Sequence, residues 1–424
     1  MKGAGALKNP KMIIFLLFAG NLFSAFDRFV INYGVVQISD EFQLNASSHG
    51  LILSVFFLGY ALMQIPGGWL SDRFGEKMIL FISIAAFSVF TGLTGLAWSI
   101  TSLLVLRFVF GLAEGSFFPA ASKLISTSIE KNKRSSAMSI FLSALTVAGL
   151  LAPILATTML VQIGWRMMFI IIGCCGLVIA LVYWFAFKPK FTSLQKVASD
   201  GASNNAQKEI PLKGIIKGLL RTPMVWSLMI ASFGYGFISW GTSSWIPTYL
   251  VNERGISLSS LGILQMIPAV TGILFFLLVG FIMDRVKSGY EKWFGMFSGA
   301  GLAITVYLMF HAETITGVII FQSLIPVFSA FLSVIIYSLP IKRLPEAQSG
   351  SATGLVNMGA QTAGFAAPVG IGYIIDAFGG SYNGAVWLLS SFGIVVLLAF
   401  LTLKISNKEP VNTTFFESKP VNVE

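Results

Sequence analysis

Apolar residues gather along this chain in long runs that are separated by shorter polar stretches. An α-helix needs roughly 20 apolar residues to cross a bilayer core that is about 30 Å thick. The segments that meet this requirement cover about 12–36, 49–71, 78–97, 101–127, 135–160, 165–187, 224–250, 258–284, 292–310, 314–340, 348–375 and 382–405. The pattern therefore predicts an all-α polytopic membrane protein with twelve transmembrane helices.

The composition points to the same class and excludes an ordinary soluble protein. Hydrophobic residues make up 55% of the 424 residues and charged residues only 11%, whereas soluble proteins are about 25% charged. A transmembrane β-barrel does not fit either, because barrel strands alternate over about ten residues, and these apolar runs are continuous.

One polar connection is much longer than the others and separates six predicted helices from six. We expect an amino-terminal six-helix bundle at 1–187, a cytoplasmic linker at 188–223 and a carboxy-terminal six-helix bundle at 224–424. Near the end of the linker, the sequence LKGIIKGLLR at 212–221 places basic residues at every fourth position, opposite apolar ones. That pattern is typical of an amphipathic helix at the headgroup level of a membrane.

The basic residues are distributed unevenly between the two sides of the predicted bundle. Twenty-four of the 28 lysines and arginines fall on the side of the termini and the linker, and the opposite connections hold only Arg166 and Arg254. Because cytoplasmic loops carry the excess of basic residues, we expect a multi-pass cell-membrane protein with both termini in the cytoplasm. The net charge of +10 then reflects topology and contact with anionic lipids, and nucleic acid is not expected as a partner.

Short motifs recur in the two halves of the chain. The sequence GLLAP at 149–153 returns as GFAAP at 364–368, and the Asp-Arg pair at 72–73 returns at 284–285. Duplicated six-helix halves favour alternating access around a site at their interface.

The stretch GGWLSDRFGEK at 67–77 joins the second and third predicted helices. Glycines let helices approach closely, and Asp72 could contact an arginine or a helix amino-terminus across the gap. Such a contact would close the cytoplasmic side in one state and break in the other, whereas the plainer interpretation is a charged turn. The predicted gating residues are Gly68, Asp72, Arg73, Asp284 and Arg285.

Four charged residues lie well inside predicted helices: Asp27, Arg28, Arg107 and Glu114. Each costs about 2.5–3.5 kcal/mol at a helix centre, so all four are expected to face the interior, pair with one another and mark a pathway. A permanent ion-pair network that only fixes helix packing remains an alternative.

Arg107 and Glu114 are seven residues apart and therefore share one helix face, about 10 Å apart. Gly111 and Gly115 on the same helix are expected to permit close packing against the first helix.

The stretch at 67–77 resembles the signature loop of the major facilitator superfamily. The sequence RFVFGLAEGSFFPA at 107–120, together with the Asp-Arg pair at 27–28 and the segment 60–68, resembles the anion:cation symporter family within it. That family includes proton-coupled carriers of sugar acids and of other carboxylates.

The resemblance implies a role for each matching residue. Asp27 and Glu114 match the protonatable pair, Arg28 and Arg107 match basic residues that manage substrate charge, and Tyr60 matches a substrate contact. The chemistry is reasonable without the family, because burial favours the neutral form of a carboxyl group and an arginine fork holds a carboxylate in bidentate fashion.

Five further residues are candidate substrate contacts: Tyr33, Gln64, Trp245, Asn357 and Gln361. The two amides lie four residues apart on one helix face and could bind substrate hydroxyls or another helix. Trp245 could line the cavity or belong to an interfacial aromatic belt.

Other positions are less informative. The segment around the Asp-Arg pair departs from the sugar-acid pattern, with Phe26 and Ile31-Asn32 where members often carry tyrosine and Leu-Ser. His49 and His311 lie near outer helix ends, where solvated surface roles are expected.

We interpret the chain as a secondary active transporter and not as an enzyme. It has no nucleotide-binding or metalloprotease motif, and its cysteines, Cys174 and Cys175, are adjacent in an apolar run. No cofactor, metal or catalytic residue is expected. The expected partners are a small organic anion, such as a hexonate, hexuronate or aldarate, and protons, in a monomer within the lipid bilayer. A drug:proton antiporter of the same superfamily or a non-transporting membrane sensor are the alternatives.

Overall fold

The computed structural model describes residues 10–130, 133–187, 212–286, 289–344 and 346–403, and every element in these ranges is helical. The helices are α1 (Pro10–Phe42), α2 (Ala46–Phe74), α3 (Glu76–Thr94), α4 (Ile100–Gly115), α5 (Phe117–Ser128), α6 (Arg134–Phe187), α8 (Leu212–Leu219), α9 (Pro223–Asn252), α10 (Leu258–Arg285), α11 (Glu291–His311), α12 (Ile315–Arg343), α13 (Glu346–Ala377) and α14 (Asn383–Thr402).

These helices confirm the predicted fold class of twelve membrane-spanning segments. α4 and α5 form one span that is interrupted at Ser116, and α6 holds two spans that meet at Gly164, where φ is +74°. The described residues contain nine stretches of helix long and apolar enough to cross a membrane, with α4 and α5 counted as one and the two spans of α6 counted together. α9 and α13 complete the set; α13 is the more polar because it is rich in glycine, serine and glutamine.

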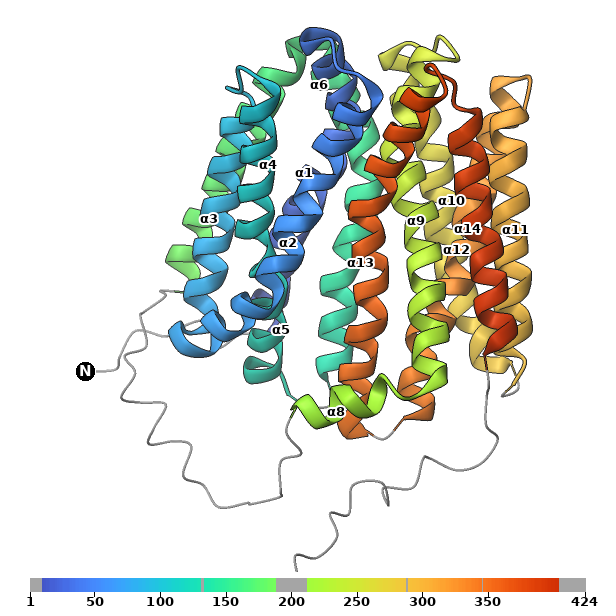
Figure 1. Cartoon of the computed structure of the whole chain (residues 1–424). Helices are drawn as coiled ribbons and strands as arrows, with labels where there is room; N and C mark the ends of the chain where they lie inside the picture. The colour runs from blue at the N-terminus through green and yellow to red at the C-terminus, as the bar shows by residue number, and fades with distance from the viewer. Residues whose placement is uncertain (1–9, 131–132, 188–211, 287–288, 345, 404–424) are drawn as a thin grey trace, which may run out of the picture.

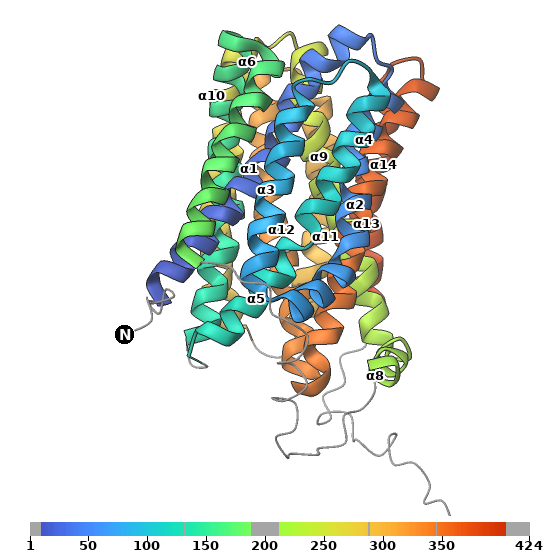
Figure 2. The same cartoon turned by 90° about the vertical axis from the view of Figure 1, so that its left-hand side faces the viewer.

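The spans lie nearly parallel and fall into two sets (Figure 1). The first set comprises α1 to α6, and the second set comprises α9 to α14. We call the end that holds Pro10 and Thr402 the terminal end, and the end with the turns at 43–45 and 379–382 the far end. α8 lies across the terminal end, outside the bundle (Figure 2). The division into domains stays a prediction, as does the interfacial role of 212–221, and residues 188–211 lie outside the described residues.

Within the first set, glycines bring α2 and α4 into backbone contact. A Cβ atom added at Gly59 would lie 2.2 Å from the Phe108 carbonyl oxygen, and one at Gly111 would lie 2.2 Å from the Phe56 carbonyl oxygen. Gly115 faces α2 in the same way. The expectation that Gly111 and Gly115 pack against the first helix was therefore wrong, because α2 occupies their face of α4.

Between the sets, glycines again mark the closest approaches, this time of α2 to α13. Added Cβ atoms would clash with the partner helix at Gly50 (2.2 Å from the Pro368 carbonyl oxygen), Gly372 (2.2 Å from the Ala46 carbonyl oxygen) and Gly364 (2.6 Å from the Phe57 ring). On α2, these contacts lie between its far end and Phe57, so the described glycine contacts close the far end of the interface.

A carboxylate from the second set holds the first turn of α2 at this end. Asp376 accepts hydrogen bonds from the backbone N–H groups of Ala46, at 2.9 Å, and Ser47, at 2.8 Å, and from the Ser47 hydroxyl. An anion is favourable at a helix amino-terminus, where N–H groups lack partners within the helix. Asp376 thus joins the two sets through backbone groups that no other residue of α2 satisfies.

His49 lies one turn deeper, and the prediction of a solvated surface role for it was wrong. Its side chain is buried, its ring stacks on Trp245 with centroids 4.5 Å apart, and its nitrogens contact the Ser39 and Thr248 hydroxyls. His49 is buried because the second set covers the far end of α2, which the sequence of α2 alone does not reveal. His311, by contrast, is exposed at the end of α11.

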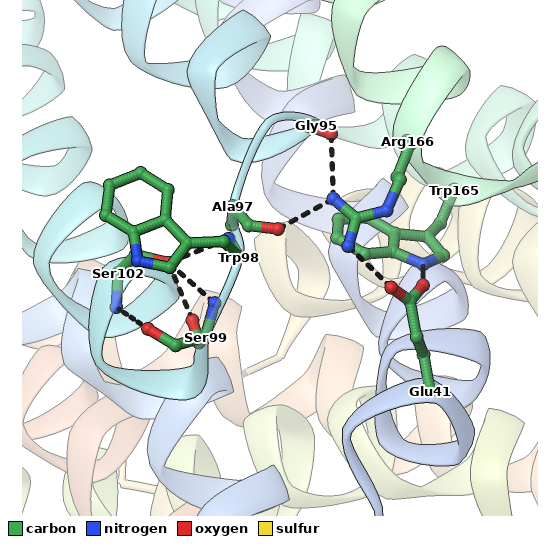
Figure 3. A network of polar contacts seen from close by, with 8 residues as sticks. All are labelled: Glu41, Gly95, Ala97, Trp98, Ser99, Ser102, Trp165 and Arg166. Atoms are coloured by element: carbon green, nitrogen blue, oxygen red, sulfur yellow. Dashed lines mark hydrogen bonds and ion pairs between the residues drawn. The ribbon is translucent and has the colours of Figure 1, made fainter.

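A polar network at the far end contains Arg166, one of the two arginines on the side of the bundle that carries few basic residues (Figure 3). Arg166 donates to the carbonyl oxygens of Gly95, at 3.3 Å, and Ala97, at 2.6 Å, and to a Glu41 carboxylate oxygen, at 2.5 Å. The other Glu41 oxygen accepts from the Trp165 indole at 2.7 Å. One guanidinium therefore fastens the end of α1, the turn after α3 and the kink of α6.

Arg254 has a similar position in the second set. It donates to the Phe310 carbonyl oxygen at 3.0 Å, to the Ala312 carbonyl oxygen at 2.8 Å and to the Tyr249 hydroxyl at 2.8 Å. Both far-end arginines thus satisfy carbonyl groups of a turn between helices, which gives each a structural role.

We expect Arg166→Lys to lower the midpoint of thermal unfolding in detergent by about 2–4 °C. An ammonium group cannot reach two carbonyl groups and a carboxylate with the fixed fork of a guanidinium. Arg285→Lys, at an exposed arginine, is the matched control and should unfold at the wild-type temperature. Equal midpoints for both variants would show that the network does not contribute to stability.

We also expect Asp376→Asn to speed hydrogen–deuterium exchange in peptides that cover 43–57. The amide lacks the charge that favours its bonds to the α2 amino-terminus, and hydrogen bonds to a charged group contribute about 1.5–3 kcal/mol. Asp40→Asn, which removes an exposed charge near the same end, is the control. Unchanged exchange in Asp376→Asn would mean that this carboxylate does not hold the far end closed.

Candidate functional site

Two crossed ion pairs lie between α1 and α4 in the middle of the first set. An Arg107 nitrogen lies 3.3 Å from an Asp27 oxygen, and Arg28 contacts Glu114 directly. Ser24 donates to the same Glu114 oxygen at 2.6 Å. The expectation that the four charged residues pair with one another is confirmed.

The helical register produces this crossed arrangement. Asp27 and Arg28 are consecutive, so their side chains leave α1 in directions about 100° apart. Arg107 and Glu114 lie two turns apart on one face of α4. Each residue of α1 therefore meets a partner of opposite charge at a different level along α4, and neither neighbour along the chain neutralises the other.

Aromatic rings enclose both guanidinium groups. Arg28 lies over the rings of Phe56 and Tyr60, at 5.0 Å from each centroid. Arg107 lies over Phe110, at 5.3 Å, and Phe169, at 4.8 Å. Cation–π contacts of this kind favour arginine in a water-poor site, and they hold the two planar groups in fixed orientations.

The four charged groups are not fully satisfied by one another. Among the residues that the structure describes, no hydrogen-bond partner is found for Asp27 Oδ1, Glu114 Oε2, Arg28 Nε, or Arg107 Nε and Nη2. Most buried polar groups in folded proteins have at least one hydrogen-bond partner, and here five atoms of one cluster have none. The unpaired atoms of the cluster are thus two carboxylate oxygens, which can accept hydrogen bonds, and three guanidinium nitrogens, which can donate them.

A small cavity lies where the cluster faces the second set. Its polar lining comes from Arg28, Asn32 and Arg107 on one side and from Trp240 and Ser244 on the other, and the remaining lining is apolar. The free volume is about 10 Å³, whereas pockets that hold small-molecule ligands span roughly 300–1,000 Å³. A ligand of several carbon atoms therefore needs the two sets to separate here.

The sequence-predicted contacts of the first set lie at different distances from this cavity. Tyr60 contacts Arg28, and Gln64 follows one turn along α2, half-buried. Tyr33 is buried in α1 but is not among the cavity-lining residues, whereas its neighbour Asn32 is. Asn32 also donates to the Ser243 hydroxyl of the second set at 3.3 Å.

The tryptophan at the cavity differs from the one singled out in the sequence. Trp245 packs on His49, and its indole donates to the Pro368 carbonyl oxygen at 3.1 Å, so it lies in the far-end interface. Trp240, five residues earlier, lines the cavity and packs against Phe57 at 4.7 Å between centroids. The sequence did not distinguish the two, because both lie in the same apolar helix.

On α13, the two amides lie on the terminal-end side of the Gly364 contact. Asn357 is exposed and accepts a hydrogen bond from the Tyr337 hydroxyl at 3.1 Å. Gln361 is half-buried, and its Oε1 atom has no hydrogen-bond partner in the described part of the chain. Sequence analysis missed Tyr337, since a single tyrosine in an apolar run carries no distinctive pattern.

The predicted gating residues of α2 have partners within the first set. Asp72 pairs with Lys123 of α5 at 2.9 Å, and its side chain is 74% exposed. The partner is thus a lysine, where the sequence suggested an arginine or a helix amino-terminus. Gly67, and not Gly68, sits at the close helix approach, because a Cβ at Gly67 would lie 2.6 Å from Ser116 Cα.

The remaining gating candidates lie at the terminal end. The Arg73 guanidinium lies over the Trp69 ring at 5.1 Å. Arg285 is exposed in the last turn of α10, and the side chain of Asp284 lies outside the described residues. The gating role of these residues stays a prediction.

Comparison with known proteins identifies the family. Residues 17–368 match the family description "Major Facilitator Superfamily". The chain belongs to this superfamily. It is therefore a multi-pass membrane transporter and not an enzyme.

Its curated relatives include several transporters that match over nearly their whole length. The chain is 29% identical to the hexuronate transporter of Bacillus subtilis, with 93% of this chain and 94% of the relative covered. It is 30% identical to the probable sulfoacetate transporter SauU of Cupriavidus necator, with 89% and 90% covered. It is 28% identical to the probable galactarate/D-glucarate transporter GudP of Escherichia coli, with 92% of each covered.

Among solved structures, the chain is similar to a bacterial homolog of the human lysosomal transporter Spinster, in an inward-facing and unoccupied conformation. The TM-score is 0.72 at 18% identity, and 95% of each chain is covered. At this identity the likeness supports the fold.

The crossed pairing predicts which charge removals are coupled. In a double-mutant cycle read by thermal unfolding, Asp27→Asn with Arg107→Gln should destabilise less than the sum of the two single changes, because either change alone strands a buried charge. Asp27→Asn with Arg28→Gln is the control, since these neighbours are not paired, and its effects should be closer to additive. Equal coupling in both cycles would contradict the crossed arrangement.

Proposed function

We propose that this transporter carries an organic anion together with protons, by alternating access between the two sets of helices. The proposed substrate is a sugar acid such as a hexonate, hexuronate or aldarate. The observation that carries the proposal is the cluster of two arginines and two carboxyl groups beside the cavity between the sets. In this cluster each arginine, which can bind an anion, is paired with a carboxyl group, which can bind a proton.

The charge balance of the cluster explains how the two ligands would be coupled. Two arginines and two ionised carboxylates sum to zero. Protonating Glu114 or Asp27 releases its arginine from the ion pair and leaves one positive charge, which a substrate carboxylate then neutralises through bidentate hydrogen bonds. Proton binding therefore strengthens anion binding, and each ligand favours the other's retention by linkage.

The relatives support the choice of an anion. The names of the three relatives described above refer to hexuronate, sulfoacetate and galactarate or D-glucarate, and all of these compounds are acids. A carrier of cationic drugs would not need a guanidinium group at its cavity, because a cation there would repel the substrate.

The uneven distribution of basic residues supports a cell-membrane protein with its terminal end in the cytoplasm. The far end, which Asp376 and the His49–Trp245 stack close, is then the external side. Uptake would begin when these contacts break and would end with release toward the cytoplasm. We propose that the transporting unit is the monomer, since the cluster and the cavity lie within one chain.

Glu114→Gln tests the coupling. Purified protein in proteoliposomes should accumulate radiolabelled glucuronate when the outside is acidic, and the variant should lose this uphill uptake while it retains exchange between preloaded compartments. A glutamine keeps the shape of the side chain but cannot exchange a proton. Glu130→Gln is the control, because this glutamate is solvent-exposed and pairs with Lys133.

Full pH-driven accumulation by Glu114→Gln would remove Glu114 from the coupling role. Binding of sugar acids without any exchange in the wild type would instead identify a sensor. Uptake of lipophilic cations coupled to proton exit, with no sugar-acid transport, would identify a drug antiporter.

A further inference from the structure

We infer that the substrate carries one carboxylate and that its other end is uncharged. This inference rests on the proposed function. It narrows the substrate class to hexuronates and hexonates, which carry one carboxylate, and disfavours aldarates, which carry two. It follows from the accessibility of the two arginines and from the absence of charge on the wall that faces them.

The two arginines both line the cavity but differ in how far they are exposed. The Arg28 side chain is 12% exposed, whereas that of Arg107 is 2% exposed. Phe110 and Phe169 enclose the Arg107 guanidinium, and Asp27 occupies one of its nitrogens. Arg28 is therefore the more accessible guanidinium, and the single positive charge that remains when one acid of the cluster is protonated matches one substrate carboxylate.

The side of the cavity formed by the second set, which we call the wall, carries no described basic residue that could pair with a second carboxylate. α9, which lines the cavity with Trp240 and Ser244, contains no charged residue over its whole length, Pro223–Asn252. The acidic residues of α13 lie at its two ends, and the basic residues of α12 lie in its last turn. Within the described residues of these three helices, no basic side chain lies at the level of the cavity.

Uncharged hydrogen-bonding groups lie on α12 and α13 instead, outside the lining of the closed cavity. Asn357 and Tyr337 are already hydrogen-bonded to each other, and the Gln361 Oε1 atom has no hydrogen-bond partner among the described residues. Amides and hydroxyls of this kind suit the hydroxyl groups of a sugar acid. A second carboxylate at the other end of a six-carbon chain would be desolvated there without a counter-charge, which is strongly unfavourable.

Competition in proteoliposomes tests this inference on the wild-type protein. Unlabelled galacturonate and gluconate, with one carboxylate each, are compared with glucarate and galactarate, with two, as inhibitors of radiolabelled glucuronate uptake. At about pH 7 all of these carboxyl groups are ionised. We expect the diacids to inhibit about tenfold more weakly or worse, and equal inhibition by the diacids would overturn the inference.

A variant that supplies the missing charge tests the uncharged wall. Asn357→Lys places an ammonium group at an exposed position of α13, and Asn357→Met removes the same hydrogen bond without adding a charge. Asn357→Lys should narrow the gap between diacids and monoacids at least about threefold, whereas Asn357→Met should leave it unchanged. A folded Asn357→Lys protein with the wild-type preference would overturn the assignment of the wall. If this variant does not fold, the wild-type competition decides alone.

The two levels of the hypothesis fail differently. Transport of neither monoacids nor diacids would refute the proposed sugar-acid function. Transport of both with equal preference would leave that function in place and refute the single-carboxylate inference.

Discussion

The need to neutralise charge inside a membrane constrains this structure more than any other interaction. Two arginines and two carboxyl groups lie in the middle of the first set, where each alone would be costly. They are tolerated because α1 and α4 bring them together as Asp27–Arg107 and Arg28–Glu114. α4 packs against α2, the charged side chains bridge the space between α1 and α4, and aromatic rings surround the guanidinium groups.

Close helix packing positions the aromatic side chains that surround the charged groups. The glycines of α2 and α4 let the two backbones touch, so that Phe56 and Tyr60 of α2 reach the Arg28 guanidinium of α1. A larger residue at Gly59 or Gly111 would push the helices apart and weaken these contacts. In a membrane, where hydrophobic burial does not drive helices together, such backbone proximity is a main source of association.

The interface between the two sets combines similar packing with contacts that can break. Gly50 and Gly372 allow close approach, while Asp376 holds the amino-terminus of α2 through hydrogen bonds alone. Within each set, by contrast, Arg166 and Arg254 fasten several segments at once. Alternating access, as proposed, requires the far-end contacts between the sets to break, whereas the contacts of Arg166 and Arg254 lie within one set each and need not change.

The sequence by itself determined the twelve spans and the four buried charges. The length of an apolar run and the presence of a charge within it are local properties, and the bilayer core sets the free-energy cost of each. It also suggested the pairing of those charges. Only the tertiary structure decided which arginine meets which acid, that Gly111 faces α2, that Asp72 meets Lys123, and that His49 is buried against Trp245. These outcomes depend on which helix lies beside which, and helical periodicity fixes only the face on which a residue sits. The neighbour that covers that face is set by the packing of helices that are distant in sequence.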